Sequence, residues 1–448
     1  MQSSNPNTTK SYTLEEAVSY LIDYRGKTPK KTLSGIPLVT AKIVKNGRLK
    51  PYNEYIAEDN YDSWMVRGIP QEGDIVLTVE APLGEVAQLD GTKIALAQRI
   101  VTLRGKQNIL YNDYLLYLLQ SKKIQVQLEA RSSGSTVKGI KQSELRKLTL
   151  DLPSLKTQKE IAHILSTLDD KIELNRKMNE TLEAMAQALF KSWFVDFDPV
   201  HAKATCKSEQ ELEIVASALG ISKEILDLFP SEFEESEMGM IPLGWKVVKF
   251  KKLVAKYIDN RGKTPPNQET GIPLLEVKNL PQEVLTPLYR TQKYVTEETY
   301  NTWFRTHLEE DDTLISTVGT IGLTNIVPPN SKFTIAQNVL GLRANTDYLK
   351  KKYMYFMMKS KRFLHDIDAR LVTTVQSSIK RKDLETIDCL VPDINLQKKF
   401  VSIIAPMLEK MQSDEILTLQ KTRDTLLQKL LSGELDVSNI HIGLDNEE

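Results

Sequence analysis

Residues 158–194 read QKEIAHILSTLDDKIELNRKMNETLEAMAQALFKSWF, and this stretch decides the architecture of the 448-residue chain. It contains neither proline nor glycine, and apolar residues recur at spacings of three and four, as at Ile161, Leu165 and Leu168. This spacing predicts one amphipathic helix. With a rise of ~1.5 Å per residue, the helix would be about 55 Å long, which is too long for the interior of a compact domain. Its apolar face therefore needs a partner.

A second stretch of the same character supplies that partner. Residues 396–431 read LQKKFVSIIAPMLEKMQSDEILTLQKTRDTLLQKLL. Proline removes a backbone donor, so we expect a kink or a later effective start at Pro406. In the first stretch, Asn175 and Asn179 stand where the stripe should be apolar. A buried asparagine can set the register of a helix pair; outward rotation of both side chains is the open alternative.

The chain contains an internal repeat. Residues 23–29, DYRGKTP, recur as residues 259–265, DNRGKTP. Further matches follow in the same order as far as Gln158 and Gln397, while the offset drifts only from 236 to 239 residues. Collinear self-similarity over this length indicates a tandem duplication. The duplicated unit is a globular domain followed by a long helix.

Each globular part has a mixed composition of elements. Short β-branched runs follow acidic turns at 74–79 and 312–318, and stretches with helical spacing follow at 111–120 and 348–360. We predict an α+β fold with two tandem mixed α/β domains, separated by two long antiparallel helices that form a coiled-coil spacer. A pseudo-two-fold axis would relate the copies. The predicted boundaries are 1–152 for the first domain, 153–197 for the first helix, 198–240 for an acidic linker with one or two short helices, 241–392 for the second domain, 393–435 for the second helix and 436–448 for a tail.

The net charge of zero conceals a segregation of charge along the chain. Residues 1–150 carry 21 Lys and Arg against 15 Asp and Glu, and residues 241–392 carry 23 against 16. The helical segments and the linker are net acidic. Two basic domains on an acidic frame favour polyanion binding at two places. Solvated surface charge without a partner is the alternative.

Several classes of protein are disfavoured. No run of 18 apolar residues occurs, and the N-terminal residues lack the pattern of a signal peptide. Cys206 and Cys389 lie far apart, and the five histidines show no metal-ligand spacing. We therefore expect a cytoplasmic protein without a metal site or a disulfide framework.

The repeated loop superficially resembles a phosphate-binding loop. Arg25-Gly26-Lys27-Thr28 ends like a Walker A motif, but Leu21 stands where that motif needs a glycine. Pro29 also keeps Thr28 out of the helical region. We reject nucleotide binding and interpret the loop as a source of donors to DNA phosphates or guanine edges. A turn with exposed cations is the alternative.

Two further regions in each copy suit DNA contact. Residues 131–141 and 372–382 are basic and rich in Ser and Thr, which suits backbone clamping, although a surface loop without a binding role fits equally well. The pairs at 98–99 and 337–338 are residue types that bond to adenine and guanine edges, or that make structural hydrogen bonds. The predicted DNA-contacting residues are Arg25, Lys27, Thr28, Gln98, Arg99, Ser135, Thr136, Lys138, Arg261, Lys263, Thr264, Gln337, Asn338, Thr374, Gln376, Lys380 and Arg381.

Sequence signatures of catalysis are missing. The chain has no Asn/Asp-Pro-Pro-Tyr/Phe motif for amino-methyl transfer, no glycine-rich cofactor loop after a strand, and no nuclease-like or Ser/His/Asp pattern. We predict no catalytic residues. Two alternatives remain: a self-contained DNA methyltransferase or nuclease with unrecognised motifs, and a coiled-coil assembly protein without a role on DNA.

At several junctions the sequence resembles one known family. Three junction motifs carry the resemblance: LPSLKTQ at 152–158, ALFKSWFVDFDP at 188–199 and IPLGW at 241–245. Together with the order domain–helix–domain–helix, they resemble the specificity (S) subunits of type I restriction–modification systems. The resemblance covers essentially the whole chain. It implies a non-catalytic DNA-binding subunit whose two target recognition domains each read one half of a bipartite sequence. The close match of the two RGKTP loops suggests that the half-sites share bases.

The resemblance also implies partners. Two adenine-methylating M subunits would dock on the spacer helices, and ATP-driven R subunits would join for cleavage. S-adenosylmethionine, ATP and magnesium would then bind to those partners and not to this chain. We expect Trp193 and Phe194, at the end of the first helix, to contribute to the M-subunit dock. The second helix lacks this aromatic ending.

Overall fold

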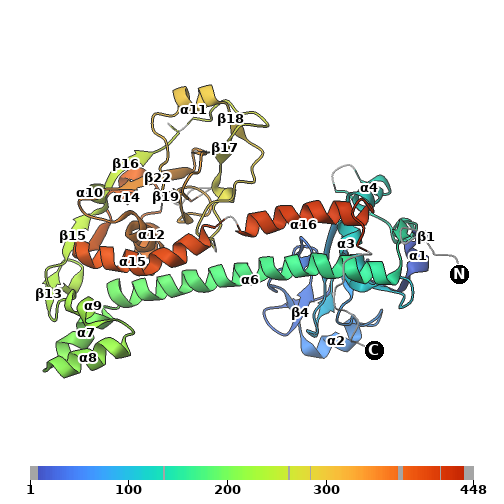
Figure 1. Ribbon diagram of the computed structural model, residues 1–448, viewed down its shortest axis with the longest axis horizontal. Coiled ribbons are helices and arrows are strands. Elements are labelled where there is room, and N and C mark those ends of the chain that lie inside the picture. The colour runs from blue at the N-terminus through green and yellow to red at the C-terminus, as the bar shows by residue number, and fades with distance from the viewer. Residues whose placement is uncertain are drawn as a thin grey trace. The chain divides into compact units, whose positions relative to one another are not determined.

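The computed structural model describes residues 9–134, 137–260, 263–282, 284–371, 377–413 and 415–437. The chain divides into two compact units (Figure 1). Unit 1 comprises Met1–Leu174 and Glu415–Glu448, and unit 2 comprises Asn175–Asp414. Each unit contains one globular domain and part of the helical frame.

Unit 1 is built on two small sheets. The larger sheet has the order β2 (Val18–Asp23), β11 (Ile100–Gly105), β8 (Ile75–Val79) and β9 (Leu83–Gln88), all antiparallel. The smaller has the order β10 (Ala95–Leu96), β4 (Ile36–Val39), β7 (Tyr55–Ile56) and β3 (Lys31–Thr32). A hairpin of β5 (Val44–Lys45) and β6 (Arg48–Leu49), helix α1 (Leu14–Ala17) and helix α2 (Tyr61–Trp64) complete this part.

The central strand β8 is buried along its whole length because it is covered on both faces. Ile75, Leu77 and Val79 belong to a core shared with α3 (Asn112–Gln120) and α4 (Lys122–Ala130), whereas Val76 belongs to a second core shared with the smaller sheet. A strand buried on both faces has a continuous apolar run, which explains its β-branched sequence. After α5 (Gln142–Leu145), strand β12 (Thr149–Leu152) pairs with β1 (Lys10–Thr13) and closes the domain.

Unit 2 repeats this topology. Its larger sheet has the order β16 (Val254–Ile258), β22 (Val339–Ala344), β19 (Thr313–Ser316) and β20 (Thr324–Ile326). The smaller has the order β18 (Tyr294–Val295), β17 (Ile272–Leu275) and β21 (Thr334–Ile335), and β15 (Lys246–Lys249) pairs with β23 (Asp388–Val391). The helices are α10 (Phe250–Leu253), α11 (Glu297–Trp303), α12 (Lys351–Lys359), α13 (Lys361–Asp368) and α14 (Arg381–Leu384). The duplication inferred from sequence is thus present in the fold.

Two repeated sequence matches have a structural role in both copies. The first is an ion pair inside each larger sheet. The Asp74 carboxylate accepts hydrogen bonds from Arg104 Nε and Nη2, and the Asp312 carboxylate accepts them from Arg343 in the same way. Asp74 is 1% exposed and Asp312 is 0% exposed. A carboxylate this deeply buried needs a paired, hydrogen-bonded cation.

The second repeated match is a buried glutamine near the start of a long helix. The Gln158 side chain accepts a hydrogen bond from the Tyr111 amide at 2.9 Å and donates to two backbone carbonyls. The Gln397 side chain makes the equivalent bonds, including one from the Lys350 amide at 3.0 Å. In each copy the glutamine therefore fastens the long helix to the loop before α3 or α12.

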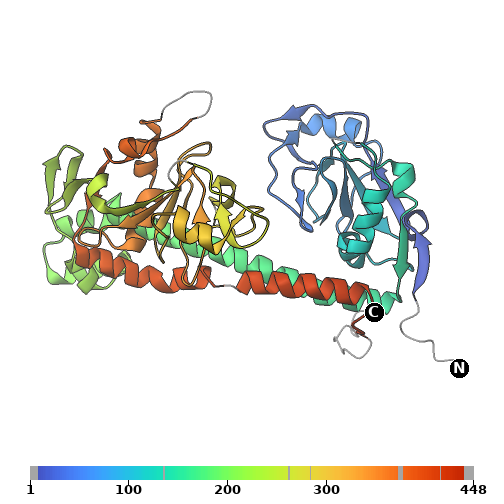
Figure 2. The same cartoon turned by 90° about the horizontal axis from the view of Figure 1, so that it is seen from above.

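The long helix predicted at 158–194 is confirmed as α6 (Leu155–Phe194), and it has an antiparallel partner in each unit (Figures 1 and 2). In unit 1, Ile161 and Leu165 share a core with Leu427 and Leu430 near the end of α16 (Glu415–Leu431). In unit 2, Phe190 near the end of α6 packs edge-on against Phe400, near the start of α15 (Ile394–Met411).

The second helix differs from the prediction. It is two helices, and α15 continues through Pro406 to Met411 before α16 begins at Glu415. Of the two expectations for Pro406, a kink or a later start of the helix, the later start is therefore wrong. A proline removes one backbone hydrogen bond, but burial of the apolar side chains of α15, including Ile404 and Leu408, outweighs that loss. On α6, Asn175 is buried and Asn179 is half-buried, so the alternative of outward rotation fails for Asn175.

The linker folds into more structure than expected. It contains three helices, α7 (Asp198–Thr205), α8 (Glu209–Ala218) and α9 (Lys223–Asp227), followed by a hairpin of β13 (Phe233–Ser236) and β14 (Gly239–Pro242). Ser208 and Ser222 cap α8 and α9 by accepting backbone hydrogen bonds, as N-cap serines do. In the described part of the chain, no helix is both long enough and apolar enough to span a membrane.

Candidate nucleic-acid interface

In unit 1, segments far apart in sequence meet beyond the end of β8. The Val79 amide donates to the Arg99 carbonyl at 3.0 Å, and the Ile140 amide donates to the Val79 carbonyl at 3.0 Å. Gly139 also forms a β-bridge with Glu80. The structure therefore brings the 98–99 pair together with the basic segment that contains Lys138.

The repeated loop 23–28 joins the same edge. The Gln98 side chain donates to Thr28 Oγ1 at 3.3 Å, and a guanidinium nitrogen of Arg25 donates to the Ile140 carbonyl. Lys27 and Thr28 are exposed. The described segments that carry the residues proposed from sequence in the first copy thus meet at one edge of the larger sheet, which we call the β8 edge; its members are residues 23–28, 79–82, 97–99 and 137–140.

Arg25 has an internal role that the sequence did not reveal. Its Nε and backbone amide donate to the Asp23 carboxylate at 2.8 and 2.9 Å, and its side chain is 29% exposed. Together with the bond to Ile140, these contacts engage Nε, Nη1 and the backbone amide of Arg25 within the chain. Arg25 positions the loop, and direct contact of Arg25 with DNA stays an untested prediction.

A further loop, missed in the sequence, is fastened to the β8 edge. The Tyr24 hydroxyl accepts from the Arg67 amide at 2.9 Å and donates to the Gly68 carbonyl at 3.1 Å. The Arg67 guanidinium donates to the carbonyls of Asp23 and Arg25 at 2.8 and 2.9 Å. Burial raises the pKa of Tyr24, which keeps the hydroxyl protonated. Tyr24 is the one position of the DYRGKTP motif that differs between the copies, and this difference was the available signal.

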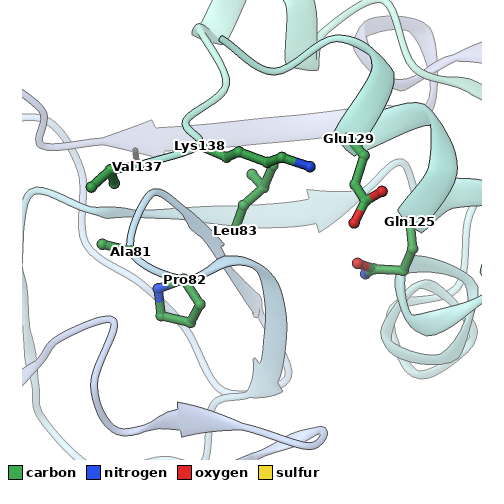
Figure 3. Close-up of a pocket in the computed structure, with 7 residues that line it drawn as sticks. All are labelled: Ala81, Pro82, Leu83, Gln125, Glu129, Val137 and Lys138. Atoms are coloured by element: carbon green, nitrogen blue, oxygen red, sulfur yellow. The ribbon is translucent and has the colours of Figure 1, made fainter. Parts of the chain in front are cut away.

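A pocket of about 350 Å³ lies beside the β8 edge. The residues that line it are Ala81 and Pro82 of the β8–β9 turn, Leu83 of β9, Gln125 and Glu129 of α4, and Val137 and Lys138. Figure 3 shows the Lys138 ammonium and the Glu129 carboxylate directed into the same space, with the Gln125 amide beside them. A site with one cation, one anion and one amide can bond to the mixed donors and acceptors of nucleic acid.

Unit 2 assembles an equivalent edge, which we call the β19 edge. The Thr317 amide donates to the Asn338 carbonyl at 2.9 Å, and the Ile379 amide donates to the Thr317 carbonyl at 3.0 Å. A β-bridge joins Val318 to Ser378. The β19 edge comprises residues 317–318, 337–338 and 378–381. The exposed predicted residues of this domain are Lys263, Thr264, Gln337, Lys380 and Arg381.

Arg381 is exposed but already has partners. Its guanidinium carbon lies 3.8 Å from the centre of the Tyr257 ring, and Nε donates to the Glu385 carboxylate at 2.8 Å. Burial, with the nearby Glu385 charge, raises the pKa of Tyr257 to about 12. The cation–π contact therefore involves a neutral phenol. Five predicted residues, Ser135, Thr136, Arg261, Thr374 and Gln376, lie outside the described residues.

The two residues proposed for the M-subunit dock are buried within this chain. Trp193 is 1% exposed and Phe194 is 5% exposed. Trp193 packs edge-on against Phe229, with ring centres 5.2 Å apart, and both side chains contact Phe400. The prediction that these side chains form a docking surface is wrong, because the linker and α15 cover them. Within the described residues, no group of three or more His, Cys, Asp or Glu side chains could hold a metal ion.

Comparison with known proteins supports the resemblance found in the sequence. Residues 12–184 match the model described as "Type I restriction modification DNA specificity domain". The type I restriction enzyme MjaIX specificity subunit of Methanocaldococcus jannaschii is 27% identical, covering 90% of this chain and 88% of its own. The HindI specificity subunit of Haemophilus influenzae is 26% identical, and the match covers 76% of this chain and 81% of that subunit. The crystal structure of a type I restriction–modification S subunit from M. genitalium matches this chain with a TM-score of 0.50 and 16% sequence identity. The match covers 96% of this chain and 98% of that chain, and it supports the fold. The resemblance in sequence is thereby confirmed: over most of its length the chain is similar to type I restriction–modification specificity subunits, and residues 12–184 match the DNA specificity domain of these systems.

Proposed function

We propose that each globular domain of this specificity subunit reads one half of a bipartite double-stranded DNA target through its β8 or β19 edge. One observation carries the proposal: both domains assemble an edge of the same construction from equivalent segments, with exposed lysine and threonine side chains and a glutamine beside them. Because the edges are equivalent, one chain would offer two DNA-binding surfaces of one design.

The side chains divide into two chemical groups. Lys27, Lys263 and Lys380 are exposed ammonium groups suited to phosphates, which hold a protein on the duplex without reading its sequence. Gln98 and Gln337 carry amides that can bond to adenine N6 and N7 in the major groove. The lysines would hold the domain on the DNA backbone and the glutamine amides would recognise bases, and the two together would give sequence-specific binding.

The proposal extends to partner subunits. We propose that two M subunits, which would hold S-adenosylmethionine, dock on exposed parts of the helical frame, where Leu174 and Met185 of α6 are 60% and 52% exposed. R subunits, with ATP and magnesium, would join this assembly for cleavage. We place the assembly in the cytoplasm, where such a complex would meet DNA. The proposal of these partners follows from the resemblance to the family.

Salt-dependent DNA binding tests the proposed surface. Removing one lysine from a DNA phosphate should reduce the slope of log K against log salt by ~0.9, so Lys27→Ala with Lys263→Ala should reduce it by about 1.8 and weaken binding at every salt concentration. The measurement is titration of the chain, assembled with its M subunits, onto duplex containing the methylated target, with the salt concentration varied.

Lys207→Ala is the matched control, since Lys207 is an exposed lysine of the linker and should leave the slope unchanged. An unchanged slope in the double variant would reject these edges as the DNA surface. Methyl transfer to DNA by the purified chain alone would favour the alternative, a self-contained methyltransferase.

A further inference from the structure

Residues 66 and 305 occupy equivalent places in the two domains and have opposite chemistry. Each follows a buried residue, Met65 or Phe304, just after a helix ends. Val66 is 75% exposed, and Arg305 is exposed. The same site in the fold therefore presents an isopropyl group in one copy and a guanidinium group in the other.

Hydrogen bonds of the neighbouring residues place Val66 next to the β8 edge. Arg67 donates to the carbonyls of Asp23 and Arg25, and the Tyr24 hydroxyl bonds to both Arg67 and Gly68. These bonds bind the loop after α2 directly to the repeated loop 23–28. The exposed Val66 therefore lies one residue before Arg67, which bonds directly to the loop that contains Lys27 and Thr28.

Arg305 is adjacent to the β19 edge by a different set of contacts. Leu308, three residues later, packs in one apolar cluster with Ile258, the last residue of β16. The chain runs from Ile258 directly into the second repeated loop, which includes Lys263. Within the described part of the chain, Arg305 has no hydrogen-bond or ion-pair partner, so its donors are available to a ligand.

We infer that this position reads one base pair in each half-site, with Val66 contacting a thymine 5-methyl group and Arg305 bonding to a guanine. An aliphatic side chain can recognise only the methyl group among the features of the major groove, whereas a guanidinium pairs with guanine O6 and N7. The half-sites would then differ at this base pair even where the RGKTP loops match. This inference rests on the proposed function, because it assumes that the two edges face DNA.

Base analogues test the inference at the level of single atoms. The recognised sequence is first obtained by sequencing methylated adenines in a host that contains the chain and its M subunits. The wild-type complex, Val66→Ala and Arg305→Ala are then bound to duplexes in which each thymidine of one half-site is replaced by deoxyuridine, or each guanine of the other half-site by 7-deazaguanine. Deoxyuridine lacks the methyl group, and 7-deazaguanine lacks the N7 acceptor.

We expect each base analogue to weaken DNA binding by the wild-type complex. The same analogue should have no effect on the variant that lacks the side chain proposed to contact that base. At one thymidine, deoxyuridine should weaken the wild-type complex about fourfold, the effect of one methyl group, and should not weaken Val66→Ala. At one guanine, 7-deazaguanine should weaken the wild type about fivefold or more and should not weaken Arg305→Ala. The controls Val126→Ala and Arg362→Ala change exposed residues of α4 and α13 and should respond as the wild type does.

Two results would overturn the inference, and they are distinguishable. If the wild type has a defined bipartite target but every analogue weakens the variants as much as the wild type, position 66/305 does not read a base. If the wild-type complex recognises no bipartite target, the proposed function fails and this inference fails with it.

Discussion

In the first domain, the Tyr24 hydroxyl fastens the repeated loop to the loop after α2, whereas the second domain has Asn260 at this place. Val66 and Arg305 differ in the same region. By contrast, the Asp–Arg ion pair and the glutamine near the start of the helix are present in both domains with the same bonds. The copies therefore agree where side chains pack within the sheet and differ where loops face outward.

This contrast has a physical cause. Residues inside the two domains satisfy the same buried geometry, and a changed partner there leaves a charge or a polar group unpaired, which is costly. Loop residues face solvent, so a substitution costs little stability and can alter the ligand. A duplicated recognition domain can thus acquire a second specificity without losing its fold.

The largest expected effect is a loss of stability when the aromatic ending of α6, which the second long helix lacks, is removed. Trp193→Ala should destabilise unit 2 by about 4–5 kcal/mol, because Trp193 is the largest fully buried side chain and a cavity of its size cannot collapse completely. Hydrogen exchange measured by mass spectrometry would follow the two units separately and should show faster exchange in unit 2 alone. Met185→Ala, an exposed change on the same helix, is the control. Equal loss of protection in both units would contradict the assignment of this cluster to unit 2.

The buried ion pair tests the equivalence of the two domains more closely. Asp74→Ala leaves the Arg104 guanidinium without its carboxylate and should cost about 3 kcal/mol in free energy of unfolding. Asp312→Ala should reduce the free energy of unfolding by less. In that variant the Glu309 carboxylate remains as a partner of Arg343, because its Oε1 lies 2.6 Å from Arg343 Nη1. Urea denaturation of each variant measures both costs. Equal costs would show that Glu309 contributes nothing to the second pair.

The smallest effect concerns the attachment of the long helices. Gln158→Ala and Gln397→Ala each leave one backbone amide and two carbonyls without side-chain partners, which should cost about 2 kcal/mol in each copy. Thermal unfolding should show similar destabilisation for the two variants and none for Gln428→Ala, an exposed change on α16. Destabilisation confined to one copy would mean that the domains are attached differently.

Much of the architecture could be read from the sequence because it is encoded locally or by repetition. The apolar spacing of α6 has the period of a helix whatever the helix contacts. The repeat DYRGKTP and DNRGKTP required only that the chain be compared with itself. Residue type brought Gln98 forward as a DNA candidate and local composition brought Lys138 forward, and the structure places their segments together.

The remaining features depended on contacts between distant parts of the chain. Arg25 bonds to Ile140, 115 residues away, so its internal role has no local signal. Trp193 is covered by Phe229 and Phe400, and an aromatic residue near a helix end is otherwise compatible with exposure. The sequence by itself therefore determined the duplication and the long helix, because period and repetition are properties of the chain, and its junction motifs gave the resemblance to a family. Only the tertiary structure decided which of these side chains are used inside the protein and which are available to DNA, because burial and hydrogen bonding depend on what else the fold brings near.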